Sequence, residues 1–315
     1  MASYKFKKAY IKKYSTISSH NEKIYSKFTI EDLFLGEKTS EKAEEKMQKL
    51  IFNDLSKNEK IDFVIGGDLS NELAITSKVF EGKEMPLLGI YSACATFCEG
   101  LILSSSLLHE FNLKNALLMV SSHNLNAEKT YKFPVEYGVP RKYTQTFTLT
   151  AGAGVIITKE ETNLKLESCS IGKVIDSKIS DVSNMGAVMA PAAFNTLMDH
   201  LKDLKRDIDY YDVVITGDLG LLGTKLFLEL LKEEDITLTN HLDAGAMIIK
   251  NKKLSDQGGS GPVCLPLFLF DEILENEKYK KILLIGTGSL HNQVLVNQKR
   301  SIPSIAHVVS LEVTK

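Results

Sequence analysis

Hydrophobic residues along the chain alternate between a helical period and short, fully apolar runs. Residues 41–57 read as an amphipathic helix. Its apolar stripe consists of Met47, Leu50, Ile51 and Leu55. The next apolar segment, 62–69, is short and ends in a Gly-Asp turn, which predicts a buried strand. Helices alternating with buried strands are typical of α/β proteins, so we expect largely parallel sheets covered by helices.

The second half of the chain repeats this order of elements. A predicted helix over about 190–206 leads into 212–219, which match the earlier strand at a constant offset. The identical pairs are Asp62 and Asp212, Val64 and Val214, Ile65 and Ile215, Gly67 and Gly217, Asp68 and Asp218, and Leu69 and Leu219. Each half continues with a cysteine in a small-residue stretch, an apolar helix and another buried strand. We interpret this as an internal duplication, with one unit over 1–165 and the other over 166–315.

The stretch from Met85 to Leu103 predicts a strand, a sharp turn and a helix. Pro86 can only begin a strand, because it fixes φ and has no N–H to donate. Small residues around Cys94 are followed by apolar residues at helical spacing. The Cys94 thiol is therefore expected near a helix N-terminus, where free N–H groups and the helix dipole favour a thiolate. A buried structural cysteine is the alternative.

Several residues stand directly after predicted strands. They are Asp68, Cys94, His123, Asp218 and Gly286. Ligands of parallel α/β sheets collect at the carboxyl ends of the strands. If the two similar halves pack together, these positions can face one shared cavity.

Composition restricts the classes of function. The 315 residues carry a formal net charge of −2, which gives no electrostatic case for nucleic-acid binding. The 4 cysteines show neither a CxxC pair nor zinc spacing, which favours a reducing compartment. No apolar run approaches the roughly 20 residues that span a bilayer, and no signal peptide is recognisable.

The N-terminal segment is basic. Its lysines are Lys5, Lys7, Lys8, Lys12 and Lys13. Such a segment either lies on an anionic membrane surface or, more commonly, is simply solvated.

A Ser-Ala-Cys-Ala turn at a predicted helix start, within a duplicated α/β unit, resembles the thiolase superfamily, which includes β-ketoacyl synthases. The chain resembles still more closely the stage V sporulation protein AD family of endospore-forming bacteria. The matching segments run in order from about residue 60 to 310. They are Gly67–Leu69, Ala93–Thr96, Ser121–Asn124, Ala127–Glu128, Phe133–Gly138, Met185–Ala193, Thr216–Leu219, Gly258–Gly261, Gly286–Gly288 and Ile302–His307.

The resemblance implies a thiolase-like duplicated αβαβα layered fold with two pseudo-symmetric halves and mostly parallel sheets. It also implies a non-catalytic relative of a condensing enzyme, without a cofactor. Such a protein binds dipicolinic acid (pyridine-2,6-dicarboxylic acid), or its calcium chelate, and helps load it into the forespore with integral membrane proteins of the same operon. A homodimer located peripherally at the cytoplasmic face of the spore inner membrane, without a transmembrane segment, is the corresponding expectation.

Condensation chemistry needs a thiolate nucleophile and side-chain donors that stabilise an enolate. Cys94 matches the nucleophile. Alignment to the synthase strand that ends in Pro-His puts Gly217 at the histidine, and alignment to the Gly-Asn-Thr-Ser loop puts Gly259 at the asparagine. Since glycine has no side chain to donate, we expect no synthase activity unless His241 or His123 substitutes. An acyltransferase that uses Cys94 as its catalytic nucleophile is the alternative function.

The candidate ligand-binding residues are Cys94, His123, Asp68, Asp218, Gly259 and Arg141. His123 is either a ligand donor or partner of Cys94, or a loop histidine satisfied by the backbone. Asp68 and Asp218 have helix capping as their default role, and a bridging Ca²⁺ is the alternative.

Arg141 belongs to a long segment, 128–143, that also contains Lys129, Tyr131 and Tyr137. A planar aromatic dianion needs a guanidinium fork for its carboxylates and a flat ring for stacking, both of which this segment offers. A loop at a dimer interface fits it equally well. We expect most histidines to be surface or structural residues, with His200 on the polar side of its helix.

Overall fold

The computed structural model describes residues 2–21, 26–131, 142–249 and 253–314. The elements of the first half are β1 (Ser3–Lys5), β2 (Tyr10–Ser19), β3 (Phe28–Ile30), α1 (Ser40–Ser56), β4 (Phe63–Gly67), α2 (Ala74–Phe80), β5 (Leu87–Gly89), α3 (Thr96–Glu110), β6 (Asn115–Ser122), α4 (Asn124–Tyr131), β7 (Phe147–Thr148) and β8 (Ala151–Thr158). Those of the second half are β9 (Leu164–Ser170), β10 (Ile175–Asp176), α5 (Met185–Leu204), β11 (Val213–Thr216), α6 (Gly220–Glu233), β12 (His241–Asp243), α7 (Ala244–Ile248), β13 (Gly259–Ser260), α8 (Cys264–Phe268), β14 (Lys281–Ser289), α9 (Gln293–Asn297) and β15 (Pro303–Val313). Short 3₁₀ or π turns complete them at Asn71–Leu73, Ile208–Tyr210 and Leu269–Ile273.

Apart from β7 and β13, which pair with each other, the strands form two similar sheets that meet along one edge. Their order is β12-β11-β14-β15-β9-β2-β8-β6-β4-β5, and the two halves of this order are joined where Tyr10 of β2 pairs with Lys165 of β9. In the first sheet β5, β4 and β6 are parallel, and β8 runs antiparallel to both β6 and β2. The second sheet repeats this: β12, β11 and β14 are parallel, and β15 runs antiparallel to both β14 and β9. Most strands of each sheet therefore point the same way, as the sequence predicts.

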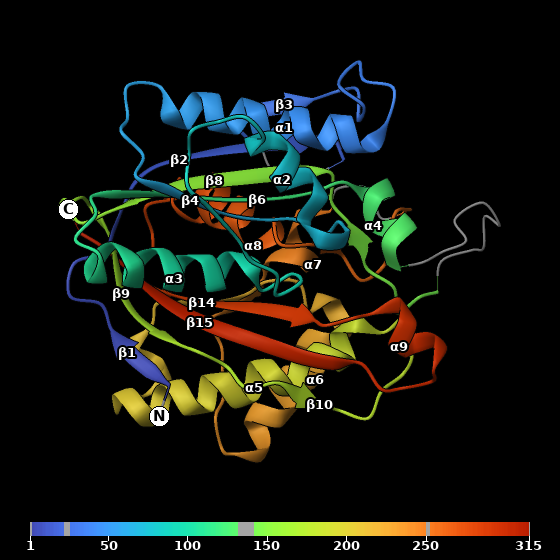
Figure 1. Ribbon diagram of the computed structural model, residues 1–315. Helices are drawn as coiled ribbons and strands as arrows, with labels where there is room; N and C mark the ends of the chain where they lie inside the picture. The colour runs from blue at the N-terminus through green and yellow to red at the C-terminus, as the bar shows by residue number, and fades with distance from the viewer. Residues whose placement is uncertain (1, 22–25, 132–141, 250–252, 315) are drawn as a thin grey trace.

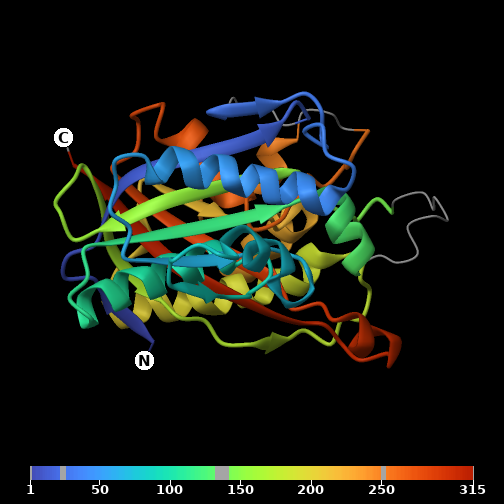
Figure 2. The same ribbon diagram turned by 45° about the horizontal axis from the view of Figure 1, so that its top comes forward.

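Helices and sheets alternate in five layers, α-β-α-β-α (Figure 1). Helix α1 covers the outer face of the first sheet, α3 and α8 lie between the sheets, and α5 and α6 cover the outer face of the second sheet; Figure 2 shows α1 lying along β8 and β6. Gly154 of β8 lets α1 approach closely, since a Cβ there would lie 2.6 Å from Ile51. The predicted layered α/β fold with two similar halves is confirmed.

Equivalent aspartates make equivalent contacts in the two halves. Asp62 accepts hydrogen bonds through Oδ2 from the backbone N–H groups of Lys114 and Asn115, at 2.7 and 3.0 Å. Asp212 accepts them from Lys280 and Lys281, both at 2.8 Å. Each carboxylate thus ties the start of one parallel strand to the start of its neighbour, which explains why both halves keep it.

The predicted helices are present with shifted ends. The amphipathic pattern over 41–57 forms α1, which begins after Thr39, whose hydroxyl accepts a hydrogen bond from the Lys42 N–H. The pattern over about 190–206 forms α5, but this helix begins earlier, at Met185, because Asn184 caps it by accepting from the Ala187 N–H.

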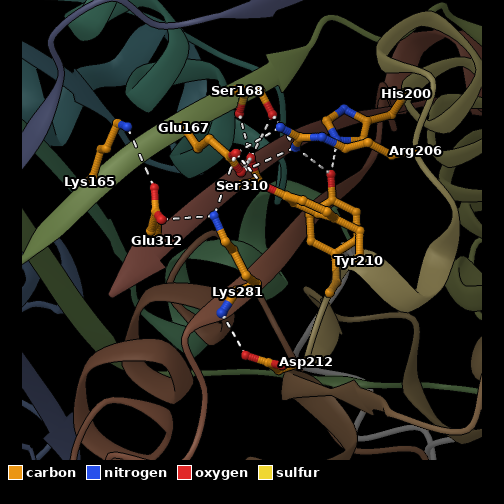
Figure 3. A network of polar contacts seen from close by, with 11 residues as sticks. Lys165, Glu167, Ser168, His200, Arg206, Tyr210, Asp212, Lys281, Ser310 and Glu312 are labelled. Atoms are coloured by element: carbon orange, nitrogen blue, oxygen red, sulfur yellow. Dashed lines mark hydrogen bonds and ion pairs between the residues drawn. The ribbon is translucent and has the colours of Figure 1, made fainter. Parts of the chain in front are cut away.

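A partly buried network of polar contacts lies beside α5 (Figure 3). Arg206 donates from Nη1 and Nη2 to the two carboxylate oxygens of Glu167, at 3.2 and 2.7 Å, and its guanidinium stacks on Tyr210. His200 belongs to this network through Tyr211, whose hydroxyl lies 2.7 Å from its Nε2, and its Nδ1 lies 2.6 Å from the Ser170 hydroxyl.

The expectation that His200 lies on a polar helix face is wrong. Its side chain is fully buried against the second sheet. Burial lowers the pKa of His200 to about 4, so the ring is neutral and serves as a hydrogen-bonding group of the core.

Candidate functional site

Cys94 occupies a tight turn between β5 and α3. The preceding Ala93 has a φ of +49°, a left-handed conformation that is strained for a residue with a Cβ. The Ser92 carbonyl accepts from the Ala95 N–H at 3.0 Å, and the Thr96 hydroxyl donates to the Ala93 carbonyl at 2.7 Å. These bonds fix the turn and leave the Cys94 thiol partly buried, two residues before the helix begins.

The second half of the chain places Asp218 and Ser260 next to this thiol. The Ser260 hydroxyl lies 3.8 Å from Cys94 Sγ and donates to Asp218 Oδ2 at 3.0 Å. The same carboxylate accepts from the Gly261 N–H at 3.1 Å and from the Thr287 hydroxyl at 2.9 Å. Asp218 follows β11 in the second half, so residues of both halves meet at Cys94. The sequence predicts that Cys94 and Asp218 lie together, because both stand directly after a predicted strand.

The Cys94 thiol is held in its protonated form. Burial raises the pKa of Cys94 most, and the neighbouring Asp218 carboxylate, which accepts a hydrogen bond from the thiol, raises it further. Burial also raises the pKa of Asp218, against the donors that stabilise its ionised form. Burial, and after it the Asp218 carboxylate from the other half, thus opposes the thiolate that a position near a helix N-terminus favours.

The two glycines that stand at the synthase histidine and asparagine positions are closely surrounded. A Cβ on Gly217 would lie 3.2 Å from the Thr287 hydroxyl, and a Cβ on Gly259 would lie 3.0 Å from Leu149 Cδ2. In the part of the chain that the structure describes, the groups that hydrogen-bond with the Cys94 thiol are Ser260, Asp218 and the Gly261 amide. No imidazole or carboxamide is among them.

Neither histidine proposed as a substitute is paired with Cys94 among the described residues. The His123 Nε2 lies 3.1 Å from the Leu33 carbonyl, and its Nδ1 accepts from the Leu125 N–H at 3.2 Å. His241 contacts the Thr216 hydroxyl at 2.9 Å, and Thr216 in turn donates to Asp243 at 2.7 Å. Burial lowers the pKa of both histidines, which keeps them neutral. The two ring nitrogens of His123 thus contact backbone groups, which matches the alternative of a loop histidine whose hydrogen bonds are satisfied by the backbone.

Asp68 holds a turn together. Its carboxylate accepts from the N–H and the hydroxyl of Ser70, and from the N–H and hydroxyl of Thr76 at 2.8 and 2.6 Å. These are contacts of a capping residue.

The other candidate residues have different surroundings. The Cys98 side chain packs against Gly286, so that a Cβ built on Gly286 would lie 2.9 Å from the Cys98 Sγ. Arg141 and Tyr137 lie outside the described residues.

Two tyrosines border the site. The Tyr91 and Tyr131 hydroxyls lie 2.6 Å apart, and the Tyr131 hydroxyl also lies 3.1 Å from the Leu69 carbonyl. Burial raises the pKa of both tyrosines most, and charge at Cys94 also acts on each, so both lie within electrostatic reach of the thiol. Tyr91 is 42% exposed. The sequence predicts no role for Ser260 or Thr287, because no local pattern reveals contacts between the halves. It predicts none for Tyr91 either, whose partner Tyr131 is 40 positions away.

The described residues contain no group of at least 3 histidine, cysteine or acidic side chains arranged to hold a metal ion. They also contain no helix with the length and hydropathy that crossing a membrane requires.

The sequence matches the family model "Stage V sporulation protein AD (SpoVAD)" over residues 7–312. The chain belongs to the stage V sporulation protein AD family. It is 34% identical over 294 residues to Stage V sporulation protein AD of Bacillus subtilis strain 168, covering 90% of this chain and 87% of that relative.

Solved structures of condensing enzymes are similar to this family member in fold. The 3-oxoacyl-[acyl-carrier-protein] synthase III of Aquifex aeolicus VF5 superposes with a TM-score of 0.62 at 12% identity, covering 96% of this chain and 99% of that one. A single-residue variant of Xanthomonas campestris OleA gives 0.64 at 13% identity, covering 97% and 99%. At this identity the likeness establishes the thiolase-like fold and carries no assignment of activity.

Proposed function

We propose that this chain is a sporulation protein that binds dipicolinic acid, or its calcium chelate, in the space around Cys94 without transforming it. The ligand follows from the family resemblance. The observation that carries the non-catalytic part is the environment of Cys94: a protonated thiol beside Asp218, with glycines at 217 and 259.

Asp218 decides which form of the ligand suits the site. Three donors, from Ser260, Gly261 and Thr287, already satisfy its carboxylate. A free dicarboxylate dianion would still be repelled by its negative charge, whereas Ca²⁺ within a chelate would be attracted. The calcium chelate is therefore the form that the electrostatics favour. The hydroxyls of Tyr91 and Tyr131 lie 2.6 Å apart at the border of the site, and we propose that these rings stack on the planar ligand.

Isothermal titration calorimetry tests this proposal directly. The chain is titrated with dipicolinic acid alone and with equimolar CaCl₂, and saturable binding is expected, tighter with calcium. Replacing Tyr131→Leu is expected to weaken binding about tenfold, since it removes one ring of the proposed stacking pair. Cys169→Ala is the control, because Cys169 is buried in β9, where it pairs with Tyr4 of β1 and Val309 of β15. Absence of heat at millimolar ligand argues against the proposal.

An acyltransferase that uses Cys94 is the second candidate function. The strained Ala93 turn, which presents Cys94 at the start of α3, favours it. Its test is intact-mass analysis after incubation with short acyl-CoA thioesters. An acyl adduct that disappears in Cys94→Ala supports acyl transfer, and an unmodified mass dismisses it.

We also propose a homodimer as the working state and integral membrane proteins as partners in ligand uptake, at the cytoplasmic face of the spore inner membrane. Strand β5 supports the dimer: it pairs with β4 on one side, and its Leu88 is 48% exposed. An exposed apolar edge strand is a template for pairing with another strand. Light scattering of wild type and Leu88→Lys tests this: a dimer is expected for the wild type and a shift toward monomer for the variant.

A further inference from the structure

One surface of the molecule combines exposed lysines with exposed apolar side chains. It surrounds a cavity of about 500 Å³ that is lined by β1, the residues after it, and the last turns of α3. We call it the N-terminal face and define it by Tyr4, Lys5, Lys7, Lys8, Phe111 and Ile171. Figure 1 shows β1 and the C-terminal end of α3 on the same side of the molecule, and Figure 2 agrees.

The three lysines of this face outnumber the acidic lining of its cavity, which consists of Glu110. Lys5, Lys7 and Lys8 are exposed, and none has an ion pair within the described residues. By contrast, Lys12, a few residues further on, pairs with Glu59 at 2.9 Å. In a chain with a net charge of −2, this leaves a local positive field on one face.

The apolar part of the face is unusually open. Tyr4 is 55% exposed, Phe111 is 65% exposed and Ile171 is 45% exposed. Phe111 follows directly after Glu110, and the Ile171 N–H donates to the Ala2 carbonyl at 2.9 Å, so Ile171 lies beside β1. Aromatic and aliphatic side chains next to lysines are the combination that membrane interfaces accept, because rings enter the headgroup region while ammonium groups meet anionic lipids.

We propose that the N-terminal face docks on an anionic lipid surface directly. This deepens the proposed function by giving its membrane location a physical contact, and it rests on that location. The face lies at the opposite end of α3 from Cys94, about 20 Å away for a helix of this length. A membrane-bound chain would therefore keep its ligand site clear of the lipid.

Co-sedimentation with vesicles tests the docking. The probes are vesicles of phosphatidylcholine alone and of phosphatidylcholine with about one-third phosphatidylglycerol. The wild-type chain is expected to bind the anionic vesicles, to release them as salt rises, and to leave the neutral vesicles unbound. Each lysine near such a surface contributes about fivefold, so the triple variant Lys5→Glu, Lys7→Glu, Lys8→Glu should lose at least tenfold in binding.

A charge-matched control uses Lys178→Glu, Lys299→Glu and Arg300→Glu. These residues are also exposed and follow β10 and α9, which Figure 1 shows on the side of the molecule away from β1. This control should bind like the wild type, and Phe111→Ser should weaken binding without changing its salt dependence. An equal loss of vesicle binding in both triple variants overturns the proposal. So does a wild-type chain that does not bind anionic vesicles, or that binds them only when membrane proteins are present. Dipicolinic acid titration of the same variants separates this outcome from a failure of the ligand proposal.

Discussion

Asp68 and Asp218 occupy the same position in the two halves, yet their carboxylates do different work. Asp68 accepts hydrogen bonds from Ser70 and Thr76 within its own turn. Asp218 reaches across the molecule to Ser260 and Gly261 and faces the Cys94 thiol. In the second half, Asp243 takes over capping by accepting from the Leu219 and Gly220 N–H groups. Because Asp243 has the capping role in the second half, the Asp218 carboxylate contacts residues of the site instead.

Removing the charge of Asp218 should activate Cys94. The carboxylate raises the pKa of the thiol, so Asp218→Asn is expected to lower that pKa and to increase the thiolate fraction. The rate of alkylation by iodoacetamide at about pH 8, followed by intact mass, should rise about tenfold. Asp68→Asn is the paired control and should leave this rate unchanged. Equal rates for wild type and Asp218→Asn would mean that the carboxylate does not govern the thiol.

Asp68→Asn should instead cost stability. The buried carboxylate accepts from Ser70 and Thr76, and an amide can accept through only one of its two terminal atoms. We expect a loss of about 1–3 kcal/mol in the free energy of unfolding. Urea denaturation measures this loss of stability. An unchanged midpoint together with weakened ligand binding would contradict the structural role of Asp68.

Gly259→Asn should not restore condensation activity. The Cβ of the new side chain would lie 3.0 Å from Leu149, a fully buried residue, so the core must shift to admit it. Overpacking of this kind costs about 1–3 kcal/mol. Thermal unfolding and an acyl-transfer assay check both statements. A variant that is as stable as the wild type and transfers acyl groups would show that the residues around Cys94 can support catalysis.

Stability should fall as pH rises through neutrality because of Glu44. Burial, and after it the charge of Asp68, raise the pKa of this α1 residue from 4.5 to about 7, against hydrogen bonds from Ser121 and Asn126. A group whose folded pKa is raised contributes stability fully below its unfolded pKa and loses it as pH rises through the folded value. The loss between about pH 5 and pH 8 is on the order of 3 kcal/mol.

Urea unfolding of wild type and Glu44→Gln at both pH values measures this contribution. The variant cannot ionise, so its stability should change less over the same range. Parallel pH profiles for the two proteins would assign the pH dependence to other groups.

Local patterns predicted the layers but not the chemistry of the site. The stripe of α1 and the matching segments 62–69 and 212–219 fix helices and strands, because burial on one face dictates their spacing. The state of Cys94 depends on Asp218, which folding brings in from the other half. The tyrosine pair Tyr91 and Tyr131 is likewise joined only by the fold. The interpretation of His200 failed because its helix is covered on the side that the pattern marked as polar.

A crystal of the chain grown with dipicolinic acid and Ca²⁺ tests the central claim most directly. The account predicts an intact ligand beside Cys94, with its calcium ion facing the Asp218 carboxylate and no covalent bond to Sγ. A ligand bound elsewhere while the space around Cys94 stays empty, or a thioester on Cys94 when acyl-CoA is added, would contradict it.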